Sequence, residues 1–140
     1  MPGYSGTPLP KKLGIKPEFR VRLANAPPEV HAELQAALAE CVVVKEKDVL
    51  DFVMLFTKSR ADLAKEFSRM AKRLAPAGML WVSWPKKSSR VTTDLQENVV
   101  REIGLAAGLV DIKVCAVTEV WSGLKFVRRV KDRKSEGRKE

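Results

Sequence analysis

A short basic loop near the middle of the chain carries the residue types that bind anions. It follows an apolar run that ends at Trp84-Pro85, and its side chains are Lys86, Lys87, Ser88, Ser89 and Arg90. An arginine can form two parallel hydrogen bonds with a phosphate or carboxylate, a lysine acts as a point charge, and serine hydroxyls donate hydrogen bonds. The loop therefore favours an anion-binding site, with a solvated surface loop as the alternative.

The residues after this loop predict the start of a helix. Thr93 stands three residues before Gln96, which is the spacing of a capping box, and an apolar helical pattern follows over Leu95–Ala107. The N-terminus of a helix offers unpaired N–H groups to anions, and ligands of open α/β sheets bind outside the carboxyl ends of the strands. Asp94 would neutralise part of such a pocket.

We therefore expect a ligand crevice bounded by three segments. They are Trp84–Arg90, the helix start at Thr93–Asp94 and the end of an earlier strand at Asn25–Pro27. Trp84 would lie at the strand end and could stack on a planar ligand, or could pack in the core. Trp81 is three residues away on the same strand and so points to the opposite face, where we expect a core position.

Metal and triad chemistry find little support in the sequence. His31 is the only histidine, which excludes a two-histidine metal site and a Ser-His-Asp triad within this chain. Cys41 and Cys115 lack metal or redox spacing and are expected to be buried free thiols. We predict neither a catalytic residue nor a metal site. Asp51 lies in an apolar run and needs a partner, such as Lys47, Arg101 or a lysine near the N-terminus.

The elements that must position this crevice alternate between strands and helices. Strands are predicted at Phe19–Ala24, Val42–Val44, Val49–Phe56, Met79–Trp84, Val110–Val120 and Leu124–Val130. Helices are expected after Pro27-Pro28, after Ser59 as N-cap, and over Leu95–Ala107. This order predicts an α/β fold with a mostly parallel sheet of five to six strands, helices on both faces, and a C-terminal antiparallel hairpin that turns at Trp121–Gly123. Few residues follow Val42–Val44 before the next strand, so its direction stays open.

Length and charge suggest one domain with basic ends. The chain of 140 residues divides into an N-terminal surface arm (1–17), a single α/β domain (18–130) and a basic tail (131–140) expected to be disordered. Of the net charge of +9, residues 1–22 carry +4, residues 128–140 carry +4 and the middle carries +1. Such a tail favours weak, salt-sensitive contact with polyanions. The chain has neither a membrane-spanning run nor an apolar signal segment, so we expect a cytoplasmic protein without a membrane partner.

Several phrases resemble an uncharacterised bacterial family that is known only as a domain of unknown function. The phrases are GYSGTPLPKKLGIK (Gly3–Lys16), LAPAGMLWVSWPKKSS (Leu74–Ser89), GLVDIKVCAV (Gly108–Val117) and WSGLKFVRR (Trp121–Arg129). The resemblance covers about residues 3–130. It implies no activity.

The order of elements, with Leu-x-Pro-x-Gly before the strand at Met79, also resembles the C-terminal half of class I S-adenosylmethionine-dependent methyltransferases. That resemblance implies a truncated Rossmann-like fold. Those enzymes hold their cofactor with a glycine-rich turn after the first strand, whereas Leu23–Pro28 contains no glycine and two prolines, which lack N–H donors.

We therefore expect a non-catalytic binding or regulatory module with a crevice for an anionic or nucleotide-type ligand, and we predict no cofactor. One alternative is a degenerate or unusual methyltransferase, for which S-adenosylmethionine would be the cofactor. Another is a weak nucleic-acid accessory protein that acts through its basic tail.

Overall fold

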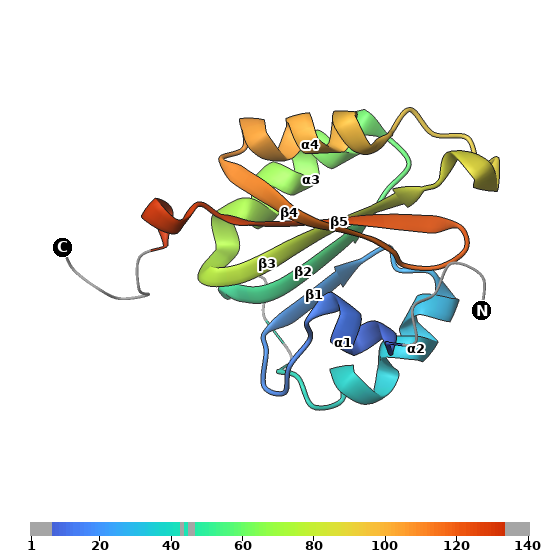
Figure 1. Cartoon of the computed structure of the whole chain (residues 1–140). Helices are drawn as coiled ribbons and strands as arrows, with labels where there is room; N and C mark the ends of the chain where they lie inside the picture. The colour runs from blue at the N-terminus through green and yellow to red at the C-terminus, as the bar shows by residue number, and fades with distance from the viewer. Residues whose placement is uncertain (1–6, 43, 45–46, 134–140) are drawn as a thin grey trace.

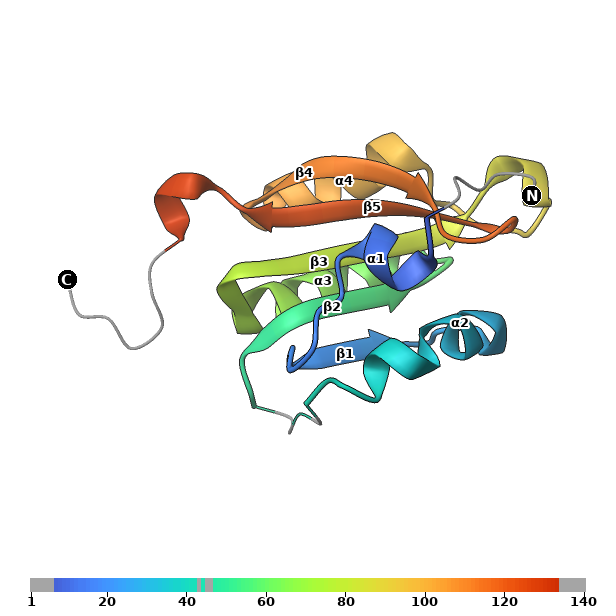
Figure 2. The same ribbon diagram turned by 60° about the horizontal axis from the view of Figure 1, so that its bottom comes forward.

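Five strands form one open sheet in the order β1-β2-β3-β5-β4 (Figures 1 and 2). The structure is a computed structural model and describes residues 7–42, 44 and 47–133. The strands are β1 (Val21–Ala24), β2 (Leu50–Phe56), β3 (Leu74–Pro85), β4 (Leu109–Ala116) and β5 (Trp121–Arg128). The pairs β1–β2 and β2–β3 are parallel, whereas β5 is antiparallel to both β3 and β4. The carboxyl ends of β1, β2 and β3 therefore meet at one edge of the sheet.

Helices cover both faces of this sheet. The helices α3 (Arg60–Arg73) and α4 (Glu97–Ala106) lie on one face, and α1 (Leu9–Leu13) and α2 (Pro28–Leu38) lie on the other (Figure 1). Two short 3-10 turns, Lys87–Ser89 and Val130–Asp132, complete the described elements. The predicted fold class, a Rossmann-like α/β sheet with a C-terminal antiparallel hairpin, is confirmed with five strands.

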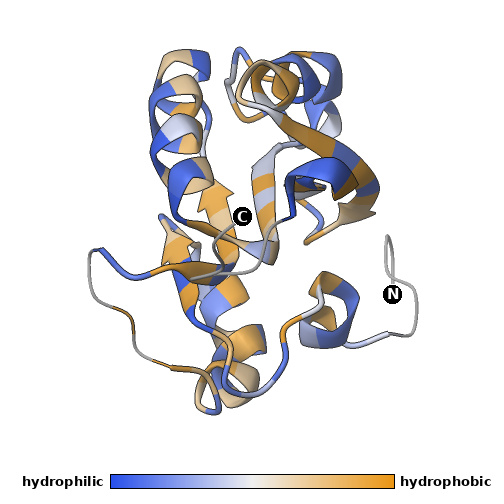
Figure 3. Cartoon of the chain, turned by 90° about the vertical axis from the view of Figure 1, so that its left-hand side faces the viewer, coloured by the Kyte–Doolittle hydropathy of each residue, from blue (hydrophilic) through white to orange (hydrophobic). Residues whose placement is uncertain are grey.

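Two hydrophobic clusters fill the space between sheet and helices. β2 carries side chains into both clusters, and its apolar residues are almost completely buried, as expected for a central parallel strand. Seen along the strands, hydrophobic positions concentrate on the sheet and hydrophilic ones are frequent on the helices (Figure 3). Trp84 belongs to the cluster under α3, and Trp81 to the cluster under α1 and α2, so the predicted opposite orientation is confirmed.

The arm before β1 is anchored in the core by α1. Leu13 is completely buried, and its carbonyl oxygen accepts a hydrogen bond of 2.9 Å from Nε1 of the equally buried Trp81. The helix ends at Gly14, whose φ of 91° lies in the left-handed region that favours glycine. Tyr4 and the tail beyond Arg133 lie outside the described residues.

Three of the predicted strand segments were wrong. β3 begins at Leu74, directly after α3, and not at Met79. Val42 forms only an isolated parallel bridge with Arg20 at the outer edge of β1, and Val43 lies outside the described residues. The hairpin turns before Trp121 rather than over Trp121–Gly123, because the Thr118 hydroxyl accepts hydrogen bonds from the backbone N–H groups of Val120 and Trp121. A threonine that binds the backbone two or three residues ahead closes a turn locally.

Asp51 pairs with Arg20, and not with any of the partners expected from the sequence. The guanidinium donates to both carboxylate oxygens, at 2.9 and 3.0 Å, and this contact holds the pKa of Asp51 below its ordinary value. Arg101 pairs instead with Asp111 and Glu97. Cys41 and Cys115 are free thiols but half-buried, and burial raises the pKa of both.

Gly104 permits the close approach of α4 to β5, which suggests a first test. A Cβ atom at this position would overlap the ring of Phe126. Alanine normally stabilises a helix interior by about 1 kcal/mol relative to glycine. Here we expect Gly104→Ala to lower the free energy of unfolding by about 1–3 kcal/mol, because the ring cannot move out of a packed core without cost. Urea denaturation measures this change.

The double variant Gly104→Ala/Phe126→Leu should recover part of the loss, because leucine leaves space beside the new methyl group. A stabilised single variant would contradict the helix–sheet contact.

Candidate functional site

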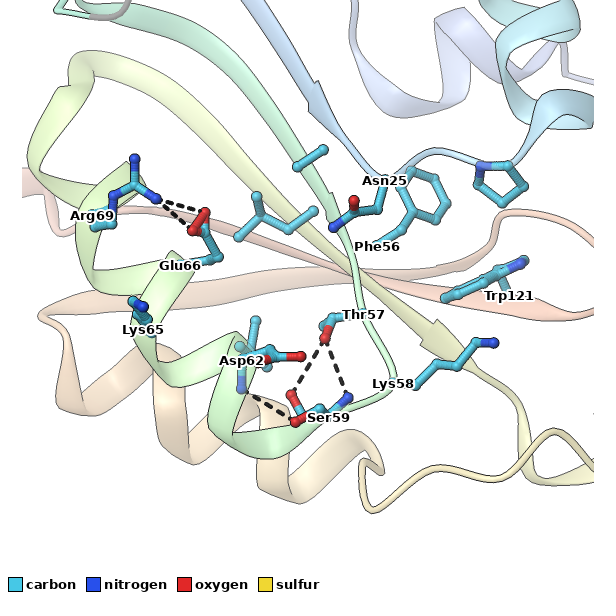
Figure 4. A pocket seen from close by; sticks show the side chains of 14 residues that line it. Asn25, Phe56, Thr57, Lys58, Ser59, Asp62, Lys65, Glu66, Arg69 and Trp121 are labelled. Atoms are coloured by element: carbon cyan, nitrogen blue, oxygen red, sulfur yellow. Dashed lines mark hydrogen bonds and ion pairs between the residues drawn. The ribbon is translucent and has the colours of Figure 1, made fainter.

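The larger cavity at the carboxyl edge of the sheet lies between the ends of β1 and β2 and the first turns of α3 (Figure 4). Its volume is about 650 Å³. Ala24 and Asn25 line it from the end of β1, Phe56 and Thr57 from the end of β2, and Trp121 from the start of β5. Ligands of open α/β sheets bind at this edge, so the cavity is a candidate ligand site.

Trp121 supplies an aromatic wall to this cavity. Its ring contacts Phe56 edge-on, with ring centroids 5.3 Å apart and an interplanar angle of 78°. The residue is half-buried, and its backbone pairs with Pro85 at the end of β3. An aromatic side chain held at its edge and open on one side can stack against a planar ligand.

Lys58 supplies the positive charge nearest to Trp121 among the labelled side chains of Figure 4. Among the described residues, no acceptor takes a hydrogen bond from its ammonium group. The backbone beneath it is fixed, because its carbonyl oxygen accepts hydrogen bonds from the Thr93 hydroxyl at 2.6 Å and the Asp94 N–H at 3.4 Å. Lys58 is thus an exposed cation on a well-anchored turn.

The flank of the cavity formed by α3 has mixed charge. Asp62 and Lys65 line this flank, and Glu66 and Arg69 form an ion pair of 2.6 Å. An ion pair on an exposed helix surface adds little stability and remains open to rearrangement. The α3 flank therefore carries both cations and acids, whereas Lys58 and the rings of Trp121 and Phe56 lie at the other end of the cavity, near β5.

The turn from β1 into α2 differs from a phosphate-binding turn in its donors. Asn25 adopts a φ of 62°, a left-handed conformation that asparagine tolerates. Pro27 is the N-cap of α2 and Pro28 its first residue, so neither has an N–H group. The N–H groups of Val30 and His31 both donate to the Pro27 carbonyl. The start of α2 therefore offers few donors to an anion.

A second cavity, of about 500 Å³, lies beyond the end of β3. It brings together five of the residues predicted from the sequence: Trp84, Lys86, Lys87, Thr93 and Asp94. The other four do not line it. Asn25 lines the larger cavity, while Ser88, Ser89 and Arg90 line neither of these two.

Much of the loop around the second cavity is engaged in its own hydrogen bonds. The Ser89 hydroxyl donates to the Lys86 carbonyl at 2.6 Å and accepts from the Val91 N–H. Trp84 is only 5 % exposed and packs in the core. It offers little surface to a stacking ligand.

The predicted capping box at Thr93 was wrong. Helix α4 begins at Glu97 after Gln96, which makes no side-chain cap. Thr93 turns instead toward Lys58, and the Asp94 carboxylate accepts a hydrogen bond of 2.7 Å from the Arg60 N–H, at the start of α3. Ser59 also caps α3, as predicted, by accepting from the Asp62 N–H. Asp94 thus caps a neighbouring helix rather than its own.

Sequence reasoning missed Lys58 and Trp121 as site residues. Lys58 lies two residues after the end of β2, the most apolar strand. Ligands of open α/β sheets bind outside the carboxyl ends of the strands, and this rule, which we applied to the end of β3, also applies to the end of β2. Trp121 was assigned to a hairpin loop, and only the pairing of β5 with β3 brings it to the edge.

Within the described residues, no group of three or more histidine, cysteine or carboxylate side chains could hold a metal ion. No helix of that part of the chain is both long and apolar enough to cross a membrane.

Residues 11–130 match the family described as "Protein of unknown function (DUF3052)", and the chain belongs to that family. No curated protein matches the chain.

Solved structures of methyltransferases share the fold. One is magnesium protoporphyrin IX methyltransferase from Synechocystis PCC 6803 with bound S-adenosylmethionine, which has a TM-score of 0.56 and 11% identity over 86% of this chain and 74% of that one. A putative methyltransferase from Thermoplasma acidophilum has a TM-score of 0.54 and 9% identity, over 89% of this chain and 76% of that one. An O-methyltransferase from neocarzinostatin biosynthesis has a TM-score of 0.59 and 10% identity, over 80% of this chain and 49% of that one. The sheet is therefore a methyltransferase-like Rossmann fold.

The capping role of Asp94 suggests a second test. We expect Asp94→Ala to lower the free energy of unfolding by about 1 kcal/mol, because the Arg60 N–H at the start of α3 loses its acceptor and the helix end loses a favourable negative charge. Thermal denaturation followed by circular dichroism measures the change. Asp132→Ala, in the 3-10 turn after β5, is the matched control and should leave the melting temperature nearly unchanged. Equal melting temperatures for all three proteins would contradict the cap.

Proposed function

We propose that this protein is a non-catalytic binding module for a small anionic ligand of the nucleotide type. The ligand would occupy the larger cavity, with its planar part against Trp121 and its anionic group near Lys58. The second cavity, with Trp84, Lys86, Lys87, Thr93 and Asp94, is the competing location. We assign no catalytic residue, because the functional groups of both cavities suit contact with a ligand rather than a reaction.

The observation that carries this proposal is the pairing of a half-buried aromatic ring with an unpartnered cation in one cavity. Tryptophan faces bind planar groups, and an ammonium group that has no carboxylate partner can bind an anion without first breaking an ion pair. The second cavity offers Lys86 and Lys87, but Asp94 and Glu97 line it as well. Two acids, Asp62 and Glu66, line the larger cavity too, so charge does not separate the two sites. The larger cavity is favoured because the ring of Trp121 is only half-buried, whereas Trp84 in the second cavity is 5 % exposed.

Adenosine monophosphate is a suitable probe, with adenosine as its uncharged counterpart. We expect the nucleotide to quench the fluorescence of Trp121 and to raise the melting temperature, since a ligand at 100 times its Kd stabilises by about 2.7 kcal/mol. Adenosine should bind more weakly. Lys58→Gln should weaken binding of the monophosphate about tenfold, because a charge-assisted hydrogen bond is lost, and should leave adenosine binding unchanged.

The double variant Lys86→Gln/Lys87→Gln is the control for the second cavity. It should retain the affinity of the wild type, and Trp121→Phe should remove the quenching. If the double variant loses binding while Lys58→Gln keeps it, the ligand occupies the second cavity instead. If millimolar adenosine monophosphate produces neither quenching nor a melting shift, the proposal fails.

A second candidate function is S-adenosylmethionine-dependent methyl transfer. The fold favours it, since structural neighbours carry bound S-adenosylmethionine or its demethylated product. The donor-poor turn at Pro27 and Pro28 argues against it, because this turn cannot cradle a carboxylate or ribose with backbone N–H groups.

Isothermal titration calorimetry with S-adenosylmethionine separates the two functions. We expect no binding heat at millimolar cofactor and no change when Pro27→Gly restores a donor and flexibility to the turn. Micromolar binding by the wild type would support the methyltransferase reading and would contradict the proposal that the module is built without this cofactor.

A further inference from the structure

Three lysines gather on the open part of the sheet face that α1 and α2 cover only in part. Lys113 on β4 and Lys125 on β5 are directly opposite each other in the antiparallel pair. Lys125 is in turn opposite Trp81, which lies in the core cluster on this face. Lys16 follows α1. In Figure 2 none of the helices of the described residues lies in front of β4 or of most of β5, so the described elements leave this part of the face uncovered.

The N-terminal arm holds two of these lysines close to one turn of the chain. The Lys113 ammonium donates a hydrogen bond of 3.1 Å to the Lys12 carbonyl. The Lys125 ammonium would lie 3.9 Å from a Cβ atom placed on Gly14, two residues later. Lys12 itself donates to the Ala116 carbonyl at 2.9 Å. The arm thus brings cations from two strands and α1 together.

This cluster carries positive charge that carboxylates do not offset. Like charges directly opposite in an antiparallel pair are destabilising. Burial lowers the pKa of Lys125, and the positive charges of Lys113 and Lys16 lower it further. None of the ion pairs of the described residues involves Lys16, Lys113 or Lys125. Asp111, on the same strand as Lys113, pairs with Arg101 of α4 on the other face.

The chemistry of this face favours a partner with closely spaced negative charges. None of the cavities described above includes these lysines, so a single small anion would remain exposed to water and salt. Duplex DNA carries one negative charge per about 1.7 Å of its axis, and one backbone can therefore meet several ammonium groups at once. A membrane surface would call for several apolar side chains that insert beside the lysines. β4 has two exposed apolar residues, Ile112 and Val114, but Val114 is opposite Leu124, whose side chain belongs to the cluster on the other face.

We propose that Lys16, Lys113 and Lys125 form a contact surface for the phosphate backbone of a nucleic acid. This surface belongs to the folded domain, and is distinct from both the cavities at the carboxyl edge and the basic tail. Lysines contact phosphates as point charges, so the surface would bind without reading base sequence. Binding at this face leaves the larger cavity free for its own ligand.

Fluorescence anisotropy with a labelled 20-base-pair duplex tests the proposal on the full chain. The triple variant Lys16→Gln/Lys113→Gln/Lys125→Gln should weaken binding at least tenfold at low salt. It should also reduce the slope of log affinity against log salt concentration by about 2 to 3, because about one counterion is released per phosphate contact. Lys125→Gln alone should melt no lower than the wild type, since it removes charge repulsion, which separates loss of binding from loss of folding.

Two triple variants with the same change in net charge are the controls. One replaces exposed basic residues on α3 and after β5 that line neither cavity, namely Lys72, Arg129 and Lys131. The other replaces basic residues of the tail, namely Lys134, Arg138 and Lys139. Both should retain most of the affinity and slope of the wild type. Equal loss in all three variants would show only a net-charge effect and overturn the surface.

Three further results would overturn the proposal. The first is loss of binding confined to the tail variant. The second is binding to vesicles that contain phosphatidylserine without binding to the duplex, which would assign the face to a membrane. The third is lack of duplex binding by the wild type at 50 mM salt.

Discussion

The hydrogen bonds between the β3–α4 loop and the start of α3 determine the shape of the carboxyl edge. Thr93 and Asp94 reach back to Lys58 and Arg60, more than thirty residues earlier in the chain. These contacts join the loop to the turn between β2 and α3. Lys58 and Ser59 of that turn line the larger cavity, and Thr93 and Asp94 of the loop line the second. They also engage the Thr93 hydroxyl and the Asp94 carboxylate in hydrogen bonds within the protein. The first role of the segment from Lys86 to Asp94 is therefore structural: it lines the second cavity, and its Asp94 caps α3.

The donor-poor turn after β1 restricts what the larger cavity can bind. In a Rossmann-like fold the first strand and the helix after it normally present backbone N–H groups to a ligand. Pro27 and Pro28 remove two such groups, and the Pro27 carbonyl takes two more N–H groups. Recognition of the proposed ligand would then rely on side chains, and Trp121 and Lys58 are the candidates that line this cavity. A shared fold with methyltransferases is compatible with a different ligand, because function depends on the site and not on the architecture.

The sequence predicted what local physics controls. The buried strand at Val49–Phe56, the cap at Ser59 and the opposite faces of Trp81 and Trp84 follow from periodicity and side-chain hydrogen bonding over a few residues. The misplaced hairpin turn has a local cause, the hydrogen bonds of Thr118, but the other failures depend on distant partners. Thr93 fits a capping box by spacing, but the Lys58 carbonyl competes for its hydroxyl. Asp51 needed a cation, and only the register of β1 against β2 selects Arg20. Trp121 becomes a site residue only through the pairing of β5 with β3.

The net charge of the folded domain does not reveal the positive surface formed by Lys113 on β4 and Lys125 on β5. Between residues 23 and 127 the chain is nearly neutral, with a net charge of +1. Several of its acids are nevertheless paired away from this face: Asp111 and Glu97 with Arg101, Glu66 with Arg69, and Asp51 with Arg20. None of these ion pairs involves Lys113 or Lys125, so the two lysines keep their positive charge. An arrangement of like charges that costs folding stability is better explained by a partner that relieves the repulsion than by packing.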